Sequence, residues 1–339
     1  MMIKQKKVIQ FGIIGCSSIA KRITIPSILN AKNANLHMIG SRNVSKAKKF
    51  AERFSCEKFG TYEDVLNDDN IDAVYISLPI GLQQKEVIRA AKKGRHVICE
   101  KSATTSLESA KKMIKICKEN NVRIMENFSF KYHPQYKLVK KIIAKKKHEN
   151  PNTFVGRFSI PMKYSSRNFR FKRKLGGSAL NDLGCYIIAS SRLVFGLEPI
   201  FINCRLYTAK NNDIDISGSI FLEFPQKHIA FGTFGYQSNF QANYEIISSN
   251  SRIDLDLAYN IRGHDKAQIN IHTKNKIKTI KLKPVDQTKL MIEDFCNSLI
   301  YNKNTLTYER DLLEQARIME VARLSNIKNR WLIVKQVRV

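Results

Sequence analysis

Short apolar runs alternate with longer amphipathic segments over the first 127 residues. The runs predict β-strands at 7–14, 34–40, 71–77, 96–100 and 122–127, the first of them rich in Val and Ile. Between them, the pattern of apolar positions predicts helices at 17–29, 45–54, 83–93 and 106–120. Strands that alternate with helices through short links indicate a parallel, doubly wound sheet, and hence an α/β fold.

The pattern changes after residue 127. An aromatic, basic turn at 128–134 leads into a basic helix predicted at 136–147, and further helices are predicted at 179–195, 287–300 and 310–325. Alternating polar and apolar residues predict strands at 154–161, 201–208, 214–224, 228–236, 243–248, 251–257, 268–273 and 276–282. Such alternation is typical of a large, mostly antiparallel open sheet. We therefore divide the chain into domains at 1–127 and 128–339, the second of α+β type, and leave open whether the last helices pack back on the first domain.

The composition restricts the class of protein. The chain has 339 residues, enough for two domains, and 43% of them are hydrophobic. Its apolar runs are shorter than the ~18–20 residues of a membrane span, and its start resembles a signal peptide only superficially. Seven scattered cysteines form no C-x-x-C pair, which argues against a zinc site or a disulfide framework. We expect a cytoplasmic protein with no metal.

The formal net charge of +29 raises the question of an anionic partner. The lysines are spread over several predicted helices, and the basic run at 145–147 has no interleaved aromatic residues. We interpret most of this charge as solvated helix surface, with a minority available to phosphate-bearing ligands. The expected partner is a small molecule, with neither nucleic acid nor membrane.

A turn between the first strand and the first helix has the position of a dinucleotide phosphate turn. Free amides and the dipole at a helix N-terminus favour the pyrophosphate of a bound dinucleotide. The fingerprint is degraded, because serine and alanine hold its second and third glycine positions, and a turn that only packs is the alternative. The predicted cofactor contacts in this turn are Gly15, Cys16, Ser17, Ser18, Ile19 and Ala20.

The end of the second strand indicates which dinucleotide binds. An NAD site needs an Asp or Glu there for the ribose 2′-hydroxyl, but this chain has Ser41 and Arg42, with Lys46 one turn later. A guanidinium suits a 2′-phosphate. NADP is therefore favoured over NAD, with an ordinary surface arginine as the alternative.

Two further stretches carry candidate chemistry. The strand at 96–100 ends in Glu100-Lys101-Ser102, and function gathers at the carboxyl ends of parallel strands. The alternative is a surface Glu-Lys pair that closes the strand. Farther along, Gly176-Gly177 precedes a helix on which Asp182 and Tyr186 lie four residues apart and share a face. Taken alone, that pair is better explained by an internal hydrogen bond.

Together these motifs resemble the Gfo/Idh/MocA oxidoreductase family over essentially the whole chain. The matching residues are the Gly12 to Ala20 turn, Glu100-Lys101 and the stretch from Gly176 to Tyr186. The tyrosine in the last motif is similar to the glucose-fructose oxidoreductase, dihydrodiol dehydrogenase and nucleotide-sugar ketoreductase branches. The resemblance implies a Rossmann domain, cofactor contacts that include Leu78, Pro79, Glu100 and Lys101, and substrate contacts at Lys131, His133, Arg170, Asp182 and Tyr186.

The resemblance also implies catalytic roles for Lys101, Asp182 and Tyr186. Reduction of a ketone by hydride creates an alkoxide, which needs a proton donor and a nearby positive charge. An ammonium group beside a phenol brings its pKa down from about 10. Tyr186 is expected to exchange the proton, Lys101 to polarise the oxygen, and Asp182 to orient the lysine.

Some residues depart from the family pattern. Ser102 replaces a proline that often follows a cis bond, and a cis bond before a non-proline residue costs roughly 3–4 kcal/mol. We therefore expect either a trans Lys101–Ser102 bond or an unusual cis one. Ile80 and Gln83 replace a common Asn and His, and Lys131 replaces an Arg, which affects the substrate more than the reaction class.

The expected function is hydride transfer between NADP and a sugar-type ketone or secondary alcohol. The basic surroundings, among them Arg167 and Arg170, and the resemblance favour a phosphorylated or nucleotide-linked sugar. Oxidation of an aldose or a trans-dihydrodiol is an alternative, and a non-catalytic dinucleotide-binding regulator is a second one. The resemblance implies a homodimer or homotetramer.

Overall fold

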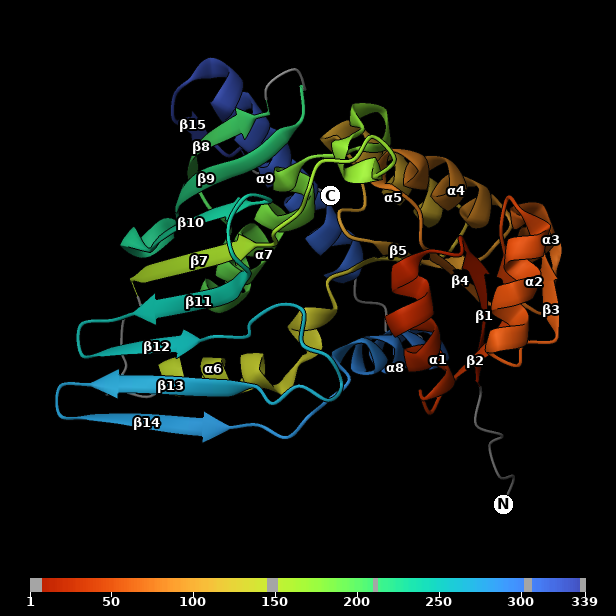
Figure 1. Cartoon of the computed structure of the whole chain (residues 1–339), viewed down its shortest axis with the longest axis horizontal. Helices are drawn as coiled ribbons and strands as arrows, with labels where there is room; N and C mark the ends of the chain where they lie inside the picture. Colours follow the sequence, from red (N-terminus) through yellow and green to blue (C-terminus); the bar gives the residue numbers. More distant parts are fainter. Residues whose placement is uncertain (1–7, 145–151, 210–212, 302–306, 336–339) are drawn as a thin grey trace. The chain divides into compact units, whose positions relative to one another are not determined.

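Six parallel strands form the first sheet of the protein, in the computed structural model that describes residues 8–144, 152–209, 213–301 and 307–335 (Figure 1). The order of the strands in space reverses between β1 and β4, which creates the crevice where doubly wound folds bind ligands. In spatial order they are β3 (Lys58–Gly60), β2 (Ala34–Gly40), β1 (Ile9–Ile14), β4 (Ala73–Ile76), β5 (His96–Glu100) and β6 (Ile124–Asn127).

Helices link these strands, and the first compact unit consists of Met1–Ser129 and Thr288–Leu313. The linking helices are α1 (Ile25–Leu29), α2 (Val44–Arg53), α3 (Tyr62–Asn67), α4 (Ile80–Lys92) and α5 (Leu107–Glu119), and α8 (Gln287–Ile300) falls largely in the same unit. A π-helical turn, Ala20–Thr24, precedes α1. The four residues of β4 are all buried, as expected for a strand covered on both faces.

The second unit consists of Phe130–Gln287 and Glu314–Val339 and contains a nine-stranded sheet. Its neighbouring strands are antiparallel except for the parallel pair β10 and β7. In spatial order they are β14 (Lys276–Lys281), β13 (Gln268–Thr273), β12 (Ser251–Leu255), β11 (Gln241–Ile247), β7 (Thr153–Ser159), β10 (Ile229–Gly235), β9 (Asp215–Glu223), β8 (Phe201–Thr208) and β15 (Leu332–Ile333). The predicted fold class of both sheets is confirmed.

Buried and half-buried residues alternate strictly along β9, so one side of this strand faces the core and the other is less covered. Helix α7 (Cys185–Phe195) packs on β7 and β10, and α6 (Pro134–Ile143) packs on β13 (Figure 1). Helix α9 (Thr307–Lys328) begins in the first unit and ends in the second. Shorter helical turns are Ser129–Tyr132, Phe169–Phe171, Arg173–Leu175, Leu180–Gly184 and Pro225–Lys227.

Several predicted boundaries differ from the structure. β3 and α3 were absent from the predicted elements, because three and six residues are too few to show a period. Helix α3 is instead marked by its capping box, in which Thr61 and Asp64 bond each other's backbone N–H groups. The part of the predicted 136–147 helix after residue 144 lies outside the described residues.

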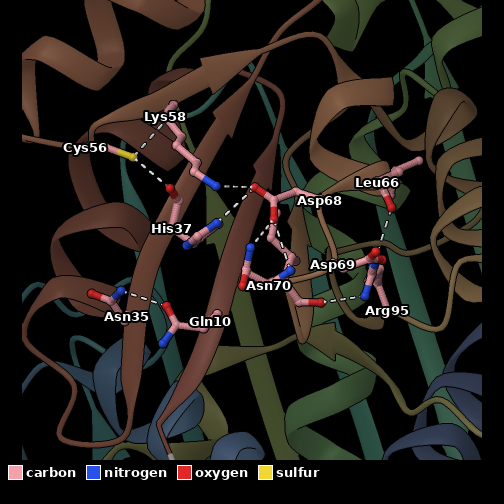
Figure 2. A network of polar contacts seen from close by, with 11 residues as sticks. Gln10, Asn35, His37, Cys56, Lys58, Leu66, Asp68, Asp69, Asn70 and Arg95 are labelled. Atoms are coloured by element: carbon pink, nitrogen blue, oxygen red, sulfur yellow. Dashed lines mark hydrogen bonds and ion pairs between the residues drawn. The ribbon is translucent and has the colours of Figure 1, made fainter.

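Asp68 is the centre of a polar network near the amino-terminal ends of β4 and β5 (Figure 2). Its carboxylate accepts hydrogen bonds from Lys58 Nζ at 2.8 Å, His37 Nε2 at 3.0 Å and the Asn70 N–H at 3.0 Å. The bond from Lys58, with those from Asn70 and His37, holds the pKa of Asp68 well below its usual range. The network lies at the opposite end of the strands from the phosphate turn and therefore serves stability.

We expect Asp68→Asn to lower the free energy of unfolding near neutral pH by about 1.5–3 kcal/mol, the range for bonds to a charged group. Because the pKa of Asp68 is lower in the folded protein than in the unfolded one, its charge stabilises the fold at pH values above the unfolded-state pKa. The difference in the free energy of unfolding between wild type and variant should therefore narrow as the pH falls below about 4. Denaturant unfolding followed by circular dichroism at several pH values measures this. The control is Asp69→Asn, whose side chain is 99% exposed and should contribute little. Equal effects of the two variants would contradict the prediction.

Candidate active site

The turn after β1 is closed so tightly that only glycine fits at position 15. Gly15 has φ +106°, and a Cβ there would lie 2.7 Å from the Ser77 carbonyl oxygen and 2.8 Å from Leu78 Cδ2. Its N–H donates to the Gly40 carbonyl at 3.0 Å. The Ser17 hydroxyl accepts the Ala20 N–H at 3.1 Å and bonds the Ser77 hydroxyl. The turn thus contacts the segment after β4, as a dinucleotide cradle requires.

The predicted cofactor residues of this turn differ in exposure. Cys16 is 6% exposed and Ala20 is fully buried, and burial raises the pKa of the Cys16 thiol. Ser17 and Ile19 are half-buried, and Ser18 is exposed. Contacts with a ligand would therefore come from backbone N–H groups and from the two serine hydroxyls. The buried side chains of Cys16 and Ala20 pack beneath the turn.

The end of β2 presents cations to solvent. Arg42 and Lys46 are exposed, while Ser41 is 6% exposed and its hydroxyl accepts the Asn43 N–H at 3.2 Å. Tyr62 lies nearby: burial raises its pKa, and the charge of Arg42 opposes that rise. This donor set fits a 2′-phosphate on the ribose, because it offers a guanidinium and an ammonium where an NAD site has a carboxylate.

The segment after β4 contacts both the phosphate turn and the end of β5. Leu78 approaches Gly15, and Pro79 precedes α4. Gln83 on α4 is fully buried, and its Nε2 donates to the Glu100 carbonyl at 3.0 Å and to the Ser102 carbonyl at 3.1 Å. Gln83 therefore holds the backbone in place on both sides of Lys101.

The Glu100 carboxylate is held inside the first unit, beside Lys101. It accepts a hydrogen bond from Asn127 Nδ2 at 2.6 Å and another from the Tyr75 hydroxyl. Burial raises the pKa of Glu100, and the bond from Tyr75 and the charge of Lys101 oppose this. Glu100 thus orients the strand end. The Lys101–Ser102 peptide bond is cis, so the expected trans alternative is wrong.

In the second unit, a π-helical turn at Leu180–Gly184 carries Asp182, and α7 begins directly after it with Cys185. Asp215 on β9 holds the start of this turn: its carboxylate accepts the Ser178 hydroxyl at 2.9 Å and the Leu180 N–H at 2.8 Å. Ahead of it, a Cβ on Gly177 would lie 2.4 Å from the Arg170 carbonyl oxygen. Gly177 therefore lets two backbone segments touch, because it has no side chain to separate them.

Asp182 forms an ion pair with a predicted substrate residue. Its Oδ2 accepts Arg170 Nε at 2.6 Å and the Tyr236 hydroxyl at 3.3 Å. Burial disfavours the charged guanidinium, but the carboxylate outweighs this and raises the pKa of Arg170. The predicted role of Asp182 in orienting Lys101 stays a prediction, and the structure adds Arg170 and Tyr236 as its partners.

The Tyr186 ring is 7% exposed and lies in an aromatic cluster. Its centroid is 5.0 Å from that of Phe158, 5.3 Å from that of Tyr259 and 5.4 Å from that of Phe130. Its hydroxyl donates to Asn260 Oδ1 at 3.3 Å. The ring is thus held by packing, while its hydroxyl meets a polar group on an exposed residue.

The two remaining predicted substrate residues differ. Lys131 is half-buried in the turn Ser129–Tyr132. His133 is 1% exposed, and its Nδ1 accepts the Gln135 N–H at 3.3 Å at the start of α6. Burial lowers the pKa of His133 to about 4, so the ring is neutral near pH 7. His133 therefore caps a helix, and it carries no charge for an anionic substrate.

The structure thus groups the predicted residues by unit. The phosphate turn, Arg42 and the Glu100-Lys101 strand end belong to the first unit, and Arg170, Asp182 and Tyr186 belong to the second. Four residues of these networks were not predicted, because no motif in the sequence marks them: Tyr75, Asn127, Tyr236 and Asn260. Gln83 was predicted only as a departure from the family pattern.

The described residues contain neither a metal-binding cluster nor a helix that could span a membrane. In the parts of the chain that the structure describes, no three His, Cys, Asp or Glu side chains gather in a way that would hold a metal ion. Among the helices of the same residues, none combines the length and the apolar character needed to cross a bilayer.

Comparison with known proteins identifies the family. Residues 9–128 match the profile "Oxidoreductase family, NAD-binding Rossmann fold", and residues 136–254 match the "GFO/IDH/MocA C-terminal domain".

The dTDP-3,4-didehydro-2,6-dideoxy-alpha-D-glucose 3-reductase of Actinomadura kijaniata is 29% identical, over 93% of this chain and 95% of that protein. The uncharacterized oxidoreductase ORF334 of Rhizobium meliloti is 32% identical, over 85% of this chain and 87% of its own. A solved structure of the 3-ketoreductase KijD10 from A. kijaniata, with NADP and TDP-benzene, has a TM-score of 0.89 at 29% identity and covers 94% of this chain and 98% of KijD10. The chain belongs to the Gfo/Idh/MocA oxidoreductase family.

Proposed function

We propose that this protein is an NADPH-dependent ketoreductase that acts on a sugar linked to a nucleoside diphosphate. The observation that carries the proposal is the likeness over nearly the whole chain to KijD10, a 3-ketoreductase whose structure holds NADP and TDP-benzene. The retention of Lys101, Asp182 and Tyr186 supports a catalyst over a regulatory dinucleotide binder. The exposed cations at the end of β2 support NADP as the cofactor.

In the proposed reaction, NADPH supplies a hydride when bound. The carbonyl oxygen then gains negative charge and needs a proton. Tyr186 is the proposed donor, because its hydroxyl is presented by a ring that packing holds in place. Lys101 is proposed to stabilise the charge on the oxygen, from a backbone that Gln83 clamps. Asp182 is proposed to orient Lys101, and its bond to Arg170 holds that guanidinium beside it.

The segment ahead of the double glycine supports an anionic substrate that carries a base. Tyr164 is 64% exposed, and its ring packs against that of Phe171 at 5.1 Å. Lys163, Arg167 and Lys172 are exposed in the same segment. An aromatic face among cations is suited to a base and to phosphates. Lys131 and Arg170 are proposed substrate contacts, and His133 is proposed to act indirectly by capping α6.

Competition by the free nucleotide, with turnover of the matching sugar, tests the proposal. The purified protein should oxidise NADPH with a thymidine-diphosphate-linked keto sugar, and thymidine diphosphate should inhibit competitively with that sugar. Absence of inhibition at millimolar nucleotide, with turnover of free aldoses or a trans-dihydrodiol, would replace the proposal by the dehydrogenase alternative. Binding of NADPH without turnover on a panel of keto sugars would favour a regulatory protein.

We expect Arg42→Ala to weaken NADPH binding by roughly 10–100-fold and NADH binding by far less, because a charged bond to phosphate contributes about 1.5–3 kcal/mol. Fluorescence titration of each reduced dinucleotide measures the two affinities. Arg53→Ala, at the exposed C-terminus of α2, is the matched control and should change neither. Equal loss for the two dinucleotides would contradict the assignment of Arg42 to the 2′-phosphate.

Location and assembly are also proposals. All seven cysteines are buried thiols, which supports a reducing cytoplasm. A homodimer or homotetramer is supported by aromatic side chains on the second unit: Phe231 is 40% and Trp331 is 44% exposed, and both contact the Phe221 ring. Sedimentation velocity of the purified chain determines the assembly.

A further inference from the structure

Asn260 lies beside the Tyr186 hydroxyl, in a loop where its neighbours are buried and Asn260 itself is exposed. Its Oδ1 accepts the hydrogen bond from that hydroxyl at 3.3 Å. Tyr259 is fully buried and Ile261 is 4% exposed, whereas Asn260 is exposed. The residues on both sides therefore place an exposed amide next to the proposed proton donor.

The loop that carries Asn260 is anchored in the second unit. The Ala258 N–H donates to the Ala242 carbonyl at 2.6 Å, and Gln287 Nε2 donates to the Tyr259 carbonyl at 3.0 Å. The Tyr259 ring packs against the Tyr186 ring with centroids 5.3 Å apart. Because these contacts hold the backbone before Asn260 and the phenol together, the fold itself keeps the amide close to the hydroxyl.

The bond between Asn260 and Tyr186 is long for its type. An O–H···O bond usually measures about 2.5–3.0 Å, so the phenol can readily exchange this acceptor for a substrate oxygen. The Asn260 amide then keeps two N–H donors and one carbonyl acceptor beside the reacting group. Such a group can bind either a hydroxyl or a second carbonyl.

We propose that Asn260 is a specificity-determining residue that binds the oxygen on the carbon next to the reacting carbonyl. This inference rests on the proposed function and deepens it. Adjacent oxygens on a sugar ring lie within hydrogen-bond distance of each other, as do the amide and the phenol. One oxygen accepts the proton of Tyr186 while its neighbour meets the amide. A sugar that lacks this second oxygen leaves the amide without that partner, which discriminates against it.

The experiment compares two thymidine-diphosphate-linked keto sugars that differ only in the hydroxyl on the carbon next to the ketone. The wild-type protein is expected to prefer the hydroxyl-bearing sugar by roughly 10–100-fold in kcat/KM. Asn260→Ala should lose most of this preference, through a lower kcat/KM on the hydroxyl-bearing sugar and a nearly unchanged value on the deoxy sugar. Isothermal titration of both sugars, with NADP bound, should show the same loss in affinity.

Asn250→Ala is the matched control, because Asn250 is an exposed asparagine in the turn between β11 and β12. It should keep the preference of the wild type, and both variants should keep NADPH affinity and thermal stability. If Asn260→Ala lowers kcat/KM equally on the two sugars, or on neither, the inference about Asn260 is overturned and the proposed function stands. A wild-type protein that neither binds nor reduces either sugar would overturn the proposed function, and the inference with it.

Discussion

Tyr186→Phe is expected to lower kcat by roughly 10²–10⁴, the contribution of a general acid, with NADPH affinity unchanged. The phenylalanine ring keeps the packing against Phe130, Phe158 and Tyr259, so the variant should fold as the wild type does. Only the hydroxyl is lost, and with it the proposed proton donor. Steady-state oxidation of NADPH with the keto sugar measures kcat, and fluorescence titration measures the NADPH affinity.

Tyr244→Phe is the matched control for this variant. Tyr244 is fully buried and stacks on Phe154 with centroids 5.0 Å apart. Tyr244→Phe also removes one hydroxyl from the second unit, but this hydroxyl has no role in the proposed mechanism. The turnover of this variant should therefore stay near that of the wild type. Unchanged turnover in Tyr186→Phe would remove Tyr186 from the proposed mechanism, and an equal loss in the two variants would indicate a general packing effect.

Lys101→Met is expected to lower kcat by roughly 10²–10³, the loss that follows removal of one group that stabilises charge on the substrate oxygen. Methionine is similar in length and carries no charge. The bonds from Gln83 go to the carbonyls of Glu100 and Ser102, so they do not depend on the side chain at position 101. The fold of the strand end should therefore survive the substitution.

Lys131→Met separates catalysis from binding. A substrate contact that acts equally in the ground state and the transition state raises KM and leaves kcat unchanged, and this is the result expected for Lys131. Lys101→Met should instead reduce kcat, and Lys101→Arg should retain part of it because the charge remains. A Lys101→Met variant whose kcat equals that of the wild type would refute the proposed role.

The pattern of the sequence predicts the alternation of strands and helices in the first unit, because covered parallel strands are apolar along their whole length. It fails where an element is too short to show a period, as in β3, and where the helical period changes. Asp182 lies in a π-helical turn and Tyr186 in the α-helix that follows. A uniform helix of 3.6 residues per turn therefore describes their shared face only approximately.

Candidate site residues were predicted from the sequence where their chemistry and their position in the fold coincide. Arg42 was predicted because it follows the second predicted strand, and Lys101 because it follows the fourth. Asn260 and Tyr236 reach the site through long-range packing, 74 residues from Tyr186 and 54 residues from Asp182. A single sequence contains no record of such contacts, since neither residue lies in a motif.

The double glycine has a consequence for directed evolution of this enzyme toward other sugars. Because any side chain at Gly177 would press into the Arg170 carbonyl, a library that varies this position should yield mostly misfolded clones. The exposed residues 163–167 carry no such restriction, so random substitution there should alter the charge and shape of the proposed substrate surface. We therefore expect new substrate preferences from libraries that vary residues 163–167 and keep Gly177 constant.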